Sequence, residues 1–187
     1  MASDRTRTSA PDHRPAPLHR APAPGGTFPP PRWATAAAHA VSLIVLPSSL
    51  WRIALVLGFP AGYTAEGFVP FQTLYAQLAM VLLSAASEFI VLLTFGLVRP
   101  WGETAPRWIP LIGGRRVHPL AATVPALLGA LGLTWIWSDL PWWWTYPHDD
   151  MTSTGGLVVG LLYLPMVLWG PLTAALAVSY WRRRRHG

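Results

Sequence analysis

The apolar run from Gln72 to Val98 constrains this chain more than any other stretch. It holds a single charged residue, Glu88, and it stops abruptly at Arg99. A helix needs about 20 apolar residues to cross the hydrocarbon core of a bilayer, and this run is long enough. The sequence therefore predicts a membrane span with one carboxyl group inside it.

Three further apolar segments, at about 33–58, 120–138 and 155–181, also have the length of membrane spans. Only 12% of the residues are charged, whereas soluble domains carry about 25%. The sequence thus predicts an all-α fold: a four-helix transmembrane bundle over residues 33–181, with spans at those three segments and at 72–98, preceded by a disordered N-terminal tail.

Both termini are basic. Residues 1–32 are rich in Pro, Ala and Arg and lack apolar periodicity, which is typical of disorder. They also lack the apolar core of a secretory signal peptide. Residues 182–187 begin with four arginines. We expect two cytoplasmic termini, of which the first is a Pro/Arg-rich tail.

The arginines orient the spans. All 14 basic residues are Arg, and every one except Arg52 lies in the tail, in the loop of residues 99–118 or at the C-terminus. The loops of residues 59–71 and 139–154 carry acids and no arginine. The positive-inside rule then predicts a plasma-membrane protein with both termini and the basic loop in the cytoplasm. Topology alone explains the net charge of +6, so we expect no nucleic-acid partner.

Glu88 is the strongest candidate for chemistry, because a charged group inside a bilayer is costly and usually has a partner or a role. Counted from the arginine-rich side, Glu88 and His39 lie at similar depths on neighbouring helices. We expect these two residues to be in contact, with Ser42 and Ser84 nearby. The pair could handle a proton or bind a polar ligand, or it could be a structural hydrogen bond between two spans.

Arg52 is the second candidate. It lies 13 residues after His39, which is about 20 Å along a helix and near the outer face. We expect it to point outward, away from Glu88. It could line an outward cavity that binds an anion, or it could pair with acids of the outer loops, which are Glu66, Asp139, Asp149 and Asp150.

Small residues at a spacing of four indicate helix contacts, because they let two backbones approach closely. They are Gly156 with Gly160, and Ala122 with Ala126 and Ala130.

The sequence predicts no metal and no cofactor. It lacks cysteine and the common nucleotide and hydrolase motifs. His148, Asp149 and Asp150 are adjacent, and three adjacent ligands do not easily converge on one ion. The cytoplasmic loop could instead grip the phosphates of anionic lipids, although topology already accounts for its charge. The candidate arginines for this contact are Arg99, Arg107, Arg115 and Arg116.

The stretches Leu46–Arg52, with His39 before it, and Leu97–Arg116 resemble a group of small, uncharacterised four-span membrane proteins of high-G+C bacteria. The resemblance covers the chain from about Trp33 to the C-terminal arginines. It implies the four-span architecture and no particular activity.

Two functions follow from these features. The leading hypothesis is a non-enzymatic accessory or structural membrane protein, able to form homo-oligomers and working through helix contacts. The alternative is a membrane-embedded enzyme or small transporter that uses Glu88, His39 and Arg52. A closed bundle would favour the first function, and a water-accessible cavity at Glu88 or Arg52 would favour the second.

Overall fold

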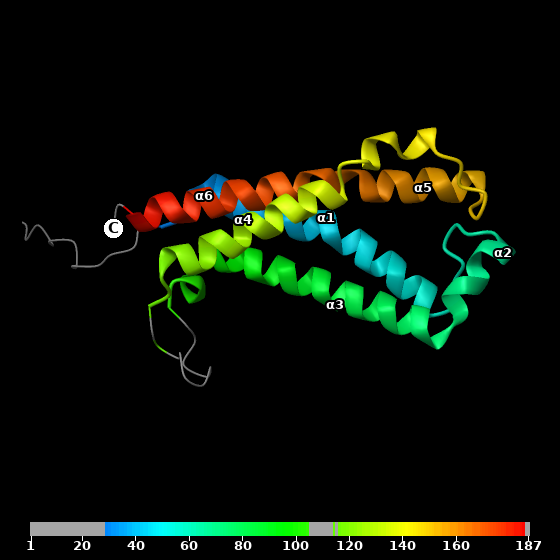
Figure 1. The fold of residues 1–187 in the computed structure, drawn as a ribbon, viewed down its shortest axis with the longest axis horizontal. Helices are drawn as coiled ribbons and strands as arrows, with labels where there is room; N and C mark the ends of the chain where they lie inside the picture. Colours follow the sequence, from blue (N-terminus) through cyan, green and yellow to red (C-terminus); the bar gives the residue numbers. More distant parts are fainter. Residues whose placement is uncertain (1–28, 105–113, 115, 186–187) are drawn as a thin grey trace, which may run out of the picture.

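A computed structural model describes residues 29–104, 114 and 116–185. These residues form helices and no β-strand (Figure 1). The predicted disordered tail, up to residue 28, and the lipid candidates Arg107 and Arg115 lie outside the described residues. In chain order the elements are α1 (Arg32–Val56), α2 (Ala65–Phe68), η1 (Val69–Gln72), α3 (Leu74–Gly96), η2 (Pro100–Gly102), α4 (Pro119–Ile136), η3 (Leu140–Thr145), α5 (Ser153–Tyr163), η4 (Leu164–Leu168) and α6 (Trp169–Arg185).

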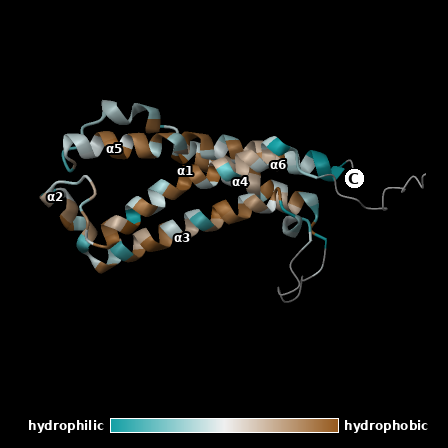
Figure 2. Cartoon of the chain, turned by 180° about the vertical axis from the view of Figure 1, so that it is seen from behind, coloured by the Kyte–Doolittle hydropathy of each residue, from teal (hydrophilic) through white to brown (hydrophobic). Residues whose placement is uncertain are grey.

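Four helical segments are long and apolar enough to cross a membrane. They are Arg32–Val56, Leu74–Gly96, Pro119–Thr145 and Ser153–Arg185. Each coincides with one of the four predicted spans, so the predicted four-helix architecture is confirmed. In Figure 2 apolar residues run along all of the long helices, and hydrophilic residues gather at the C-terminal end of α6. The chain is a multi-pass membrane protein by the length and composition of its helices.

The long helices form a row in which the two inner helices, α1 and α6, each have a main neighbour on either side. α3 packs against α1, α1 also packs against α6, and α6 packs closely against α4. α3 and α4 are at the two ends of this order of contacts and make few contacts with each other. The row is therefore open between α3 and α4.

Threonines start three of the helices. Thr64 accepts a hydrogen bond from the Gly67 amide, Thr73 from the Ala76 amide, and Thr152 from the Gly155 amide. Such N-caps pair amide groups that the first helical turn leaves without a partner. Each cap fixes where α2, α3 or α5 leaves the loop before it.

Two of these caps also join the loops at one end of the bundle. The Thr64 hydroxyl donates to the Asp150 carbonyl, and the Thr152 hydroxyl donates to the Gly62 carbonyl. Gly62 has a positive φ of 104°, and a Cβ on Gly155 would collide with the Gly62 backbone. We call this contact between residues 62–64 and 150–155 the loop clamp.

The fourth span is one long helix interrupted by η4, where Pro165 removes a backbone donor. α6 approaches α4 most closely at Gly170, where a Cβ would collide with Thr134 and with the Ala130 carbonyl. Ala130 thus lies at a close helix contact, as predicted. Gly160 instead packs against the indole of Trp143 in η3, which folds back along α5.

Candidate functional site

Arg52 is the most deeply buried charge among the residues that the structure describes within the spans, with 5% of its surface exposed. Its Nε donates to Ser84 Oγ of α3 at 2.9 Å. Its Nη2 lies 3.3 Å from Ser49 Oγ and 3.4 Å from Ser87 Oγ, and its Nη1 lies 3.4 Å from the Tyr163 hydroxyl. The guanidinium is therefore surrounded by hydroxyl groups from α1, α3 and α5.

Glu88 lies on the exposed side of α3, next to this cluster. Ser49 Oγ donates a hydrogen bond of 2.8 Å to Glu88 Oε1. Because Ser49 Oγ also accepts from Arg52, one hydroxyl connects the buried cation to the carboxyl group. We call Arg52, Ser49 and Glu88 the α1–α3 relay.

The predicted contact between Glu88 and His39 is wrong. His39 Nδ1 lies 2.7 Å from the Thr35 carbonyl, and its ring meets Phe95 edge to face at 5.3 Å between centroids. Ser42 also bonds within its own helix, to the Ala38 carbonyl.

The error lies in the register of the two helices. The prediction counted the depth of His39 from Trp33 and that of Glu88 from Arg99, as if Trp33 and Arg99 were level. Phe95, next to the last residue of α3, lies beside His39, seven residues into α1. The start of α1 therefore projects about two turns beyond the end of α3.

The same shift corrects the prediction for Arg52. The sequence placed Arg52 near the outer face, pointing away from Glu88 and toward the acids of the outer loops. It lies instead inside the helix row, against hydroxyls of α3. A signal for this was present in the sequence: Ser84, Ser87 and Glu88 are spaced so that they share one face of a helix.

Aromatic rings close the cluster on the side of the loop clamp. Trp51 lies between Tyr63 and Tyr163, with centroid distances of 5.8 Å and 5.7 Å. Trp51 Nε1 donates to the Ala61 carbonyl at 2.9 Å. Burial, with the nearby Asp150 carboxylate, raises the pKa of Tyr63 to about 12. Tyr63 is therefore neutral over the whole physiological pH range.

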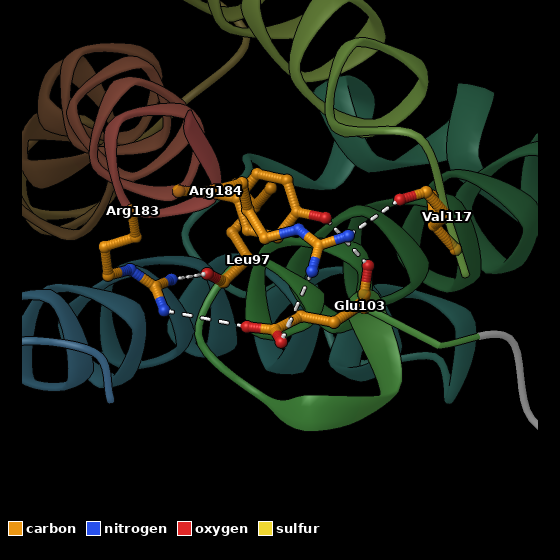
Figure 3. Close-up of polar contacts among 7 residues, drawn as sticks. Leu97, Glu103, Val117, Arg183 and Arg184 are labelled. Atoms are coloured by element: carbon orange, nitrogen blue, oxygen red, sulfur yellow. Dashed lines mark hydrogen bonds and ion pairs between the residues drawn. The ribbon is translucent and has the colours of Figure 1, made fainter. Parts of the chain in front are cut away.

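The C-terminal arginines are held at the opposite end of the bundle (Figure 3). Glu103 Oε1 lies 3.8 Å from Arg183 Nη1, and Glu103 Oε2 lies 3.8 Å from Arg184 Nη1. Arg183 Nη2 donates to the Leu97 carbonyl at 2.7 Å, and Arg184 Nη2 donates to the Val117 carbonyl at 3.0 Å. These contacts dock the end of α6 on both sides of the basic loop, and we call them the arginine rim.

Two of the predicted lipid-binding arginines are described, and both are exposed. Arg99 directly precedes η2, and Arg116 forms an isolated backbone bridge with Thr104. Both therefore flank the arginine rim. The sequence prediction did not include Arg183 and Arg184, although the run of four arginines at the chain end was visible.

An apolar groove of about 350 Å³ lies between α3 and α4, where the row is open. Its lining includes Ile90, Leu93, Trp101, Ala126, Gly129 and Thr173. Thr173 is 4% exposed, and its hydroxyl has no hydrogen-bond partner among the described residues. The groove therefore has apolar walls and one unpaired hydroxyl.

Over the described ranges, no three His, Asp or Glu side chains gather in a way that could hold a metal ion. The ring centroids of His148 and Trp143 lie 3.8 Å apart, with the two rings tilted by 40°, and His148 Nδ1 lies 2.8 Å from the Tyr146 carbonyl.

No family model, curated protein or solved structure matches this chain.

Proposed function

We propose that the protein works without catalysis, as an accessory or structural component of the plasma membrane that pairs with a second copy of itself through α3. The observation that carries the proposal is the exposure of Glu88. This carboxyl group lies eight residues before the end of α3, about 12 Å inside the span, on a surface that faces lipid.

Lipid tails offer Glu88 no hydrogen bond, and ionisable groups within a membrane usually face protein or water. On the side of Glu88 away from Ser84 and Ser87, its neighbours on α3 are apolar or small and are also exposed: Val81, Ala85 and Leu92. This surface has the composition of a helix contact, with one polar group at its centre.

A second copy of the chain suits this surface because two carboxyl groups can hydrogen-bond to each other. Two such groups related by a two-fold axis can satisfy each other, and a two-fold interface brings the same residue of both chains together. On the other side of Glu88, Ser49 already donates to Oε1, so the carboxyl group is held in place before association.

Native mass spectrometry of gently solubilised full-length protein tests the pairing. We expect dimers for the unaltered chain and monomers for Glu88→Leu. The matched control is Glu88→Gln, which should keep the dimer because an amide also donates and accepts. A clean monomer of the unaltered protein, or a dimer that survives Glu88→Leu, would overturn the proposal.

The proposal includes the orientation, with both termini in the cytoplasm. The described arginines at the chain ends and in the basic loop lie at one end of the bundle. Asp150 belongs to the loop clamp at the other end, and Asp149 directly precedes it. This separation is what the positive-inside rule requires of a single orientation.

The absence of cysteine allows a direct test of the orientation. Asp149→Cys and Thr104→Cys each introduce a single thiol, at opposite ends of the bundle. A membrane-impermeant maleimide should label Asp149→Cys on intact cells, and it should label Thr104→Cys only after the cells are opened. The reverse pattern would invert the topology.

The alternative function, an enzyme or small transporter, loses one of its three expected residues, because His39 lies apart from the α1–α3 relay. Arg52 makes its hydrogen bonds to Ser49, Ser84, Ser87 and Tyr163. Groups that are already paired with one another fasten α1 to α3, and this supports a structural role.

A further inference from the structure

We infer that the groove between α3 and α4 holds one acyl chain of an anionic phospholipid from the inner leaflet, with its phosphate at the arginine rim. This inference rests on the proposed orientation, which places the rim at the cytoplasmic face. It does not depend on dimer formation through Glu88.

The groove is open toward lipid because α3 and α4 make few contacts with each other. Its walls come from apolar and small residues of both helices, such as Leu93, Ala126 and Gly129. In water such an opening would gather any apolar ligand. In a bilayer its neighbours are acyl chains, and a volume of about 350 Å³ is within the range of small-ligand sites.

Two glycines build the mouth of the groove. A Cβ on Gly96 would lie 2.8 Å from the Trp101 ring, and a Cβ on Gly102 would collide with the Gly96 carbonyl. Their lack of side chains lets η2 fold back over the end of α3 and lay Trp101 along the groove. Tryptophan prefers the membrane interface, where one lipid headgroup meets its chains.

The mouth of the groove and the arginine rim share residues. Leu97 lines the groove and its carbonyl accepts from Arg183, while Gly102 lines the groove and its carbonyl accepts from the Tyr180 hydroxyl. A chain in the groove therefore brings its headgroup to the rim.

The charge of the arginines at the mouth of the groove determines which phospholipid headgroup binds there. Arg183 and Arg184 share the single carboxylate of Glu103, and the exposed Arg99 and Arg116 flank them. Among the residues that the structure describes at the mouth, these four arginines outnumber the one carboxylate, and guanidinium groups bind phosphate with paired hydrogen bonds. A phospholipid with a net negative headgroup complements this excess, whereas a zwitterionic one does not.

Two glycines of α4 provide matched variants for the test. A Cβ at either Gly129 or Gly132 would meet nothing within 4 Å, but only Gly129 is among the residues that line the groove. Gly129→Phe therefore fills the groove, and Gly132→Phe adds the same ring to the same helix elsewhere.

The experiment is native mass spectrometry of the full chain in detergent micelles, with added phosphatidylglycerol or phosphatidylcholine of identical acyl chains. We expect phosphatidylglycerol adducts on the unaltered protein and on Gly132→Phe, and their loss on Gly129→Phe. Arg99→Gln should reduce the preference for phosphatidylglycerol about fivefold, the effect of one arginine near an anionic surface.

Three outcomes would overturn the inference: equal retention of both lipids by the unaltered protein, no adduct at all, or equal adducts on Gly129→Phe and Gly132→Phe. Thr173→Val tests a different ligand. An acyl chain makes no hydrogen bond, so this variant should keep the phosphatidylglycerol adduct. A co-purified neutral prenyl quinone that is lost with Thr173→Val would show that the groove takes a carbonyl ligand instead. A reversed labelling pattern would place the bound lipid in the outer leaflet. It would not change the adducts expected in the mass-spectrometry experiment.

Discussion

Ser49 Oγ donates to Glu88 Oε1 at 2.8 Å, and this bond links a buried arginine to an exposed carboxyl group on α3. The serine is small, so it can lie between the Arg52 and Glu88 side chains without separating α1 from α3. The bond also explains why Arg52 and Glu88, which are not in direct contact, belong to one arrangement. Substitutions at any two of Arg52, Ser49 and Glu88 should therefore have non-additive effects on the stability of the protein.

Replacing Arg52 should destabilise the helix row. Arg52→Leu removes the donor of four hydrogen bonds, and hydrogen bonds between membrane helices average about 0.6 kcal/mol each, so we expect a loss of about 2 kcal/mol. Arg52→Lys should recover part of it, because an ammonium donates from one point only. Denaturation by a graded increase of ionic detergent measures both. An unchanged midpoint for Arg52→Leu would contradict the role of the α1–α3 relay.

The loop clamp gives a prediction with a neighbouring control. Gly155→Ala adds a Cβ that collides with the Gly62 backbone, and overpacking of this kind costs about 1–3 kcal/mol. Gly156→Ala, one residue later in α5, adds a Cβ that meets nothing within 4 Å. It should be neutral or stabilising, since Ala favours a helix over Gly. Thermal unfolding in detergent compares the two variants, and similar melting temperatures would show that the contact is not tight.

The loop clamp should also loosen at alkaline pH. Tyr63 has a pKa of about 12 in the fold against its ordinary value of 10, so the folded protein favours the neutral phenol. This contribution to stability is fully present below pH 10 and is lost as the pH rises through about 12.

The ultraviolet absorbance of tyrosinate, taken as the difference between the unaltered protein and Tyr63→Phe, measures this titration directly. We expect a midpoint near 12 in the folded protein and near 10 after denaturation. A folded-state midpoint near 10 would mean that water reaches the Tyr63 hydroxyl freely.

The arginine rim should control access to the chain end. Glu103→Gln removes the carboxylate shared by Arg183 and Arg184, whose side chains are 12% and 14% exposed. At about 1 kcal/mol for a partly screened pair, trypsin should cut the C-terminal arginines several times faster. Glu66→Gln makes the same charge change at an exposed site in α2 and should leave the cleavage rate unaltered. High salt should speed cleavage of the unaltered protein and have less effect on Glu103→Gln.

The number and position of the four membrane-spanning segments were predictable because each depends on a local property, the length of an apolar run. Leu74–Gly96 lies within two residues of the predicted span at either end. The all-α class followed from the same property.

The partners of Glu88 and His39 were not predictable in this way, because they depend on how far one helix slides along another. That slide is set by packing: Leu97 and Val98, after α3, share a buried cluster with Ala34 and Ala38 near the start of α1. No sequence pattern within α1 or α3 indicates this contact. The hydroxyls at Ser84 and Ser87, on the face of Glu88, were the one local sign of a partner such as Arg52.

Lipid beside α4 meets a wall of 18 helical residues, about 27 Å tall, before the chain turns into η3. Next to α4 in the row, the 33 residues of Ser153–Arg185 reach about 50 Å and end in four arginines. A bilayer about 30 Å thick fits the first wall and is exceeded by the second. These two neighbouring segments thus differ in length, and tilting or local thickening of the bilayer accommodates the longer one. Bilayer thickness is therefore one of the variables that set the tilt of this protein.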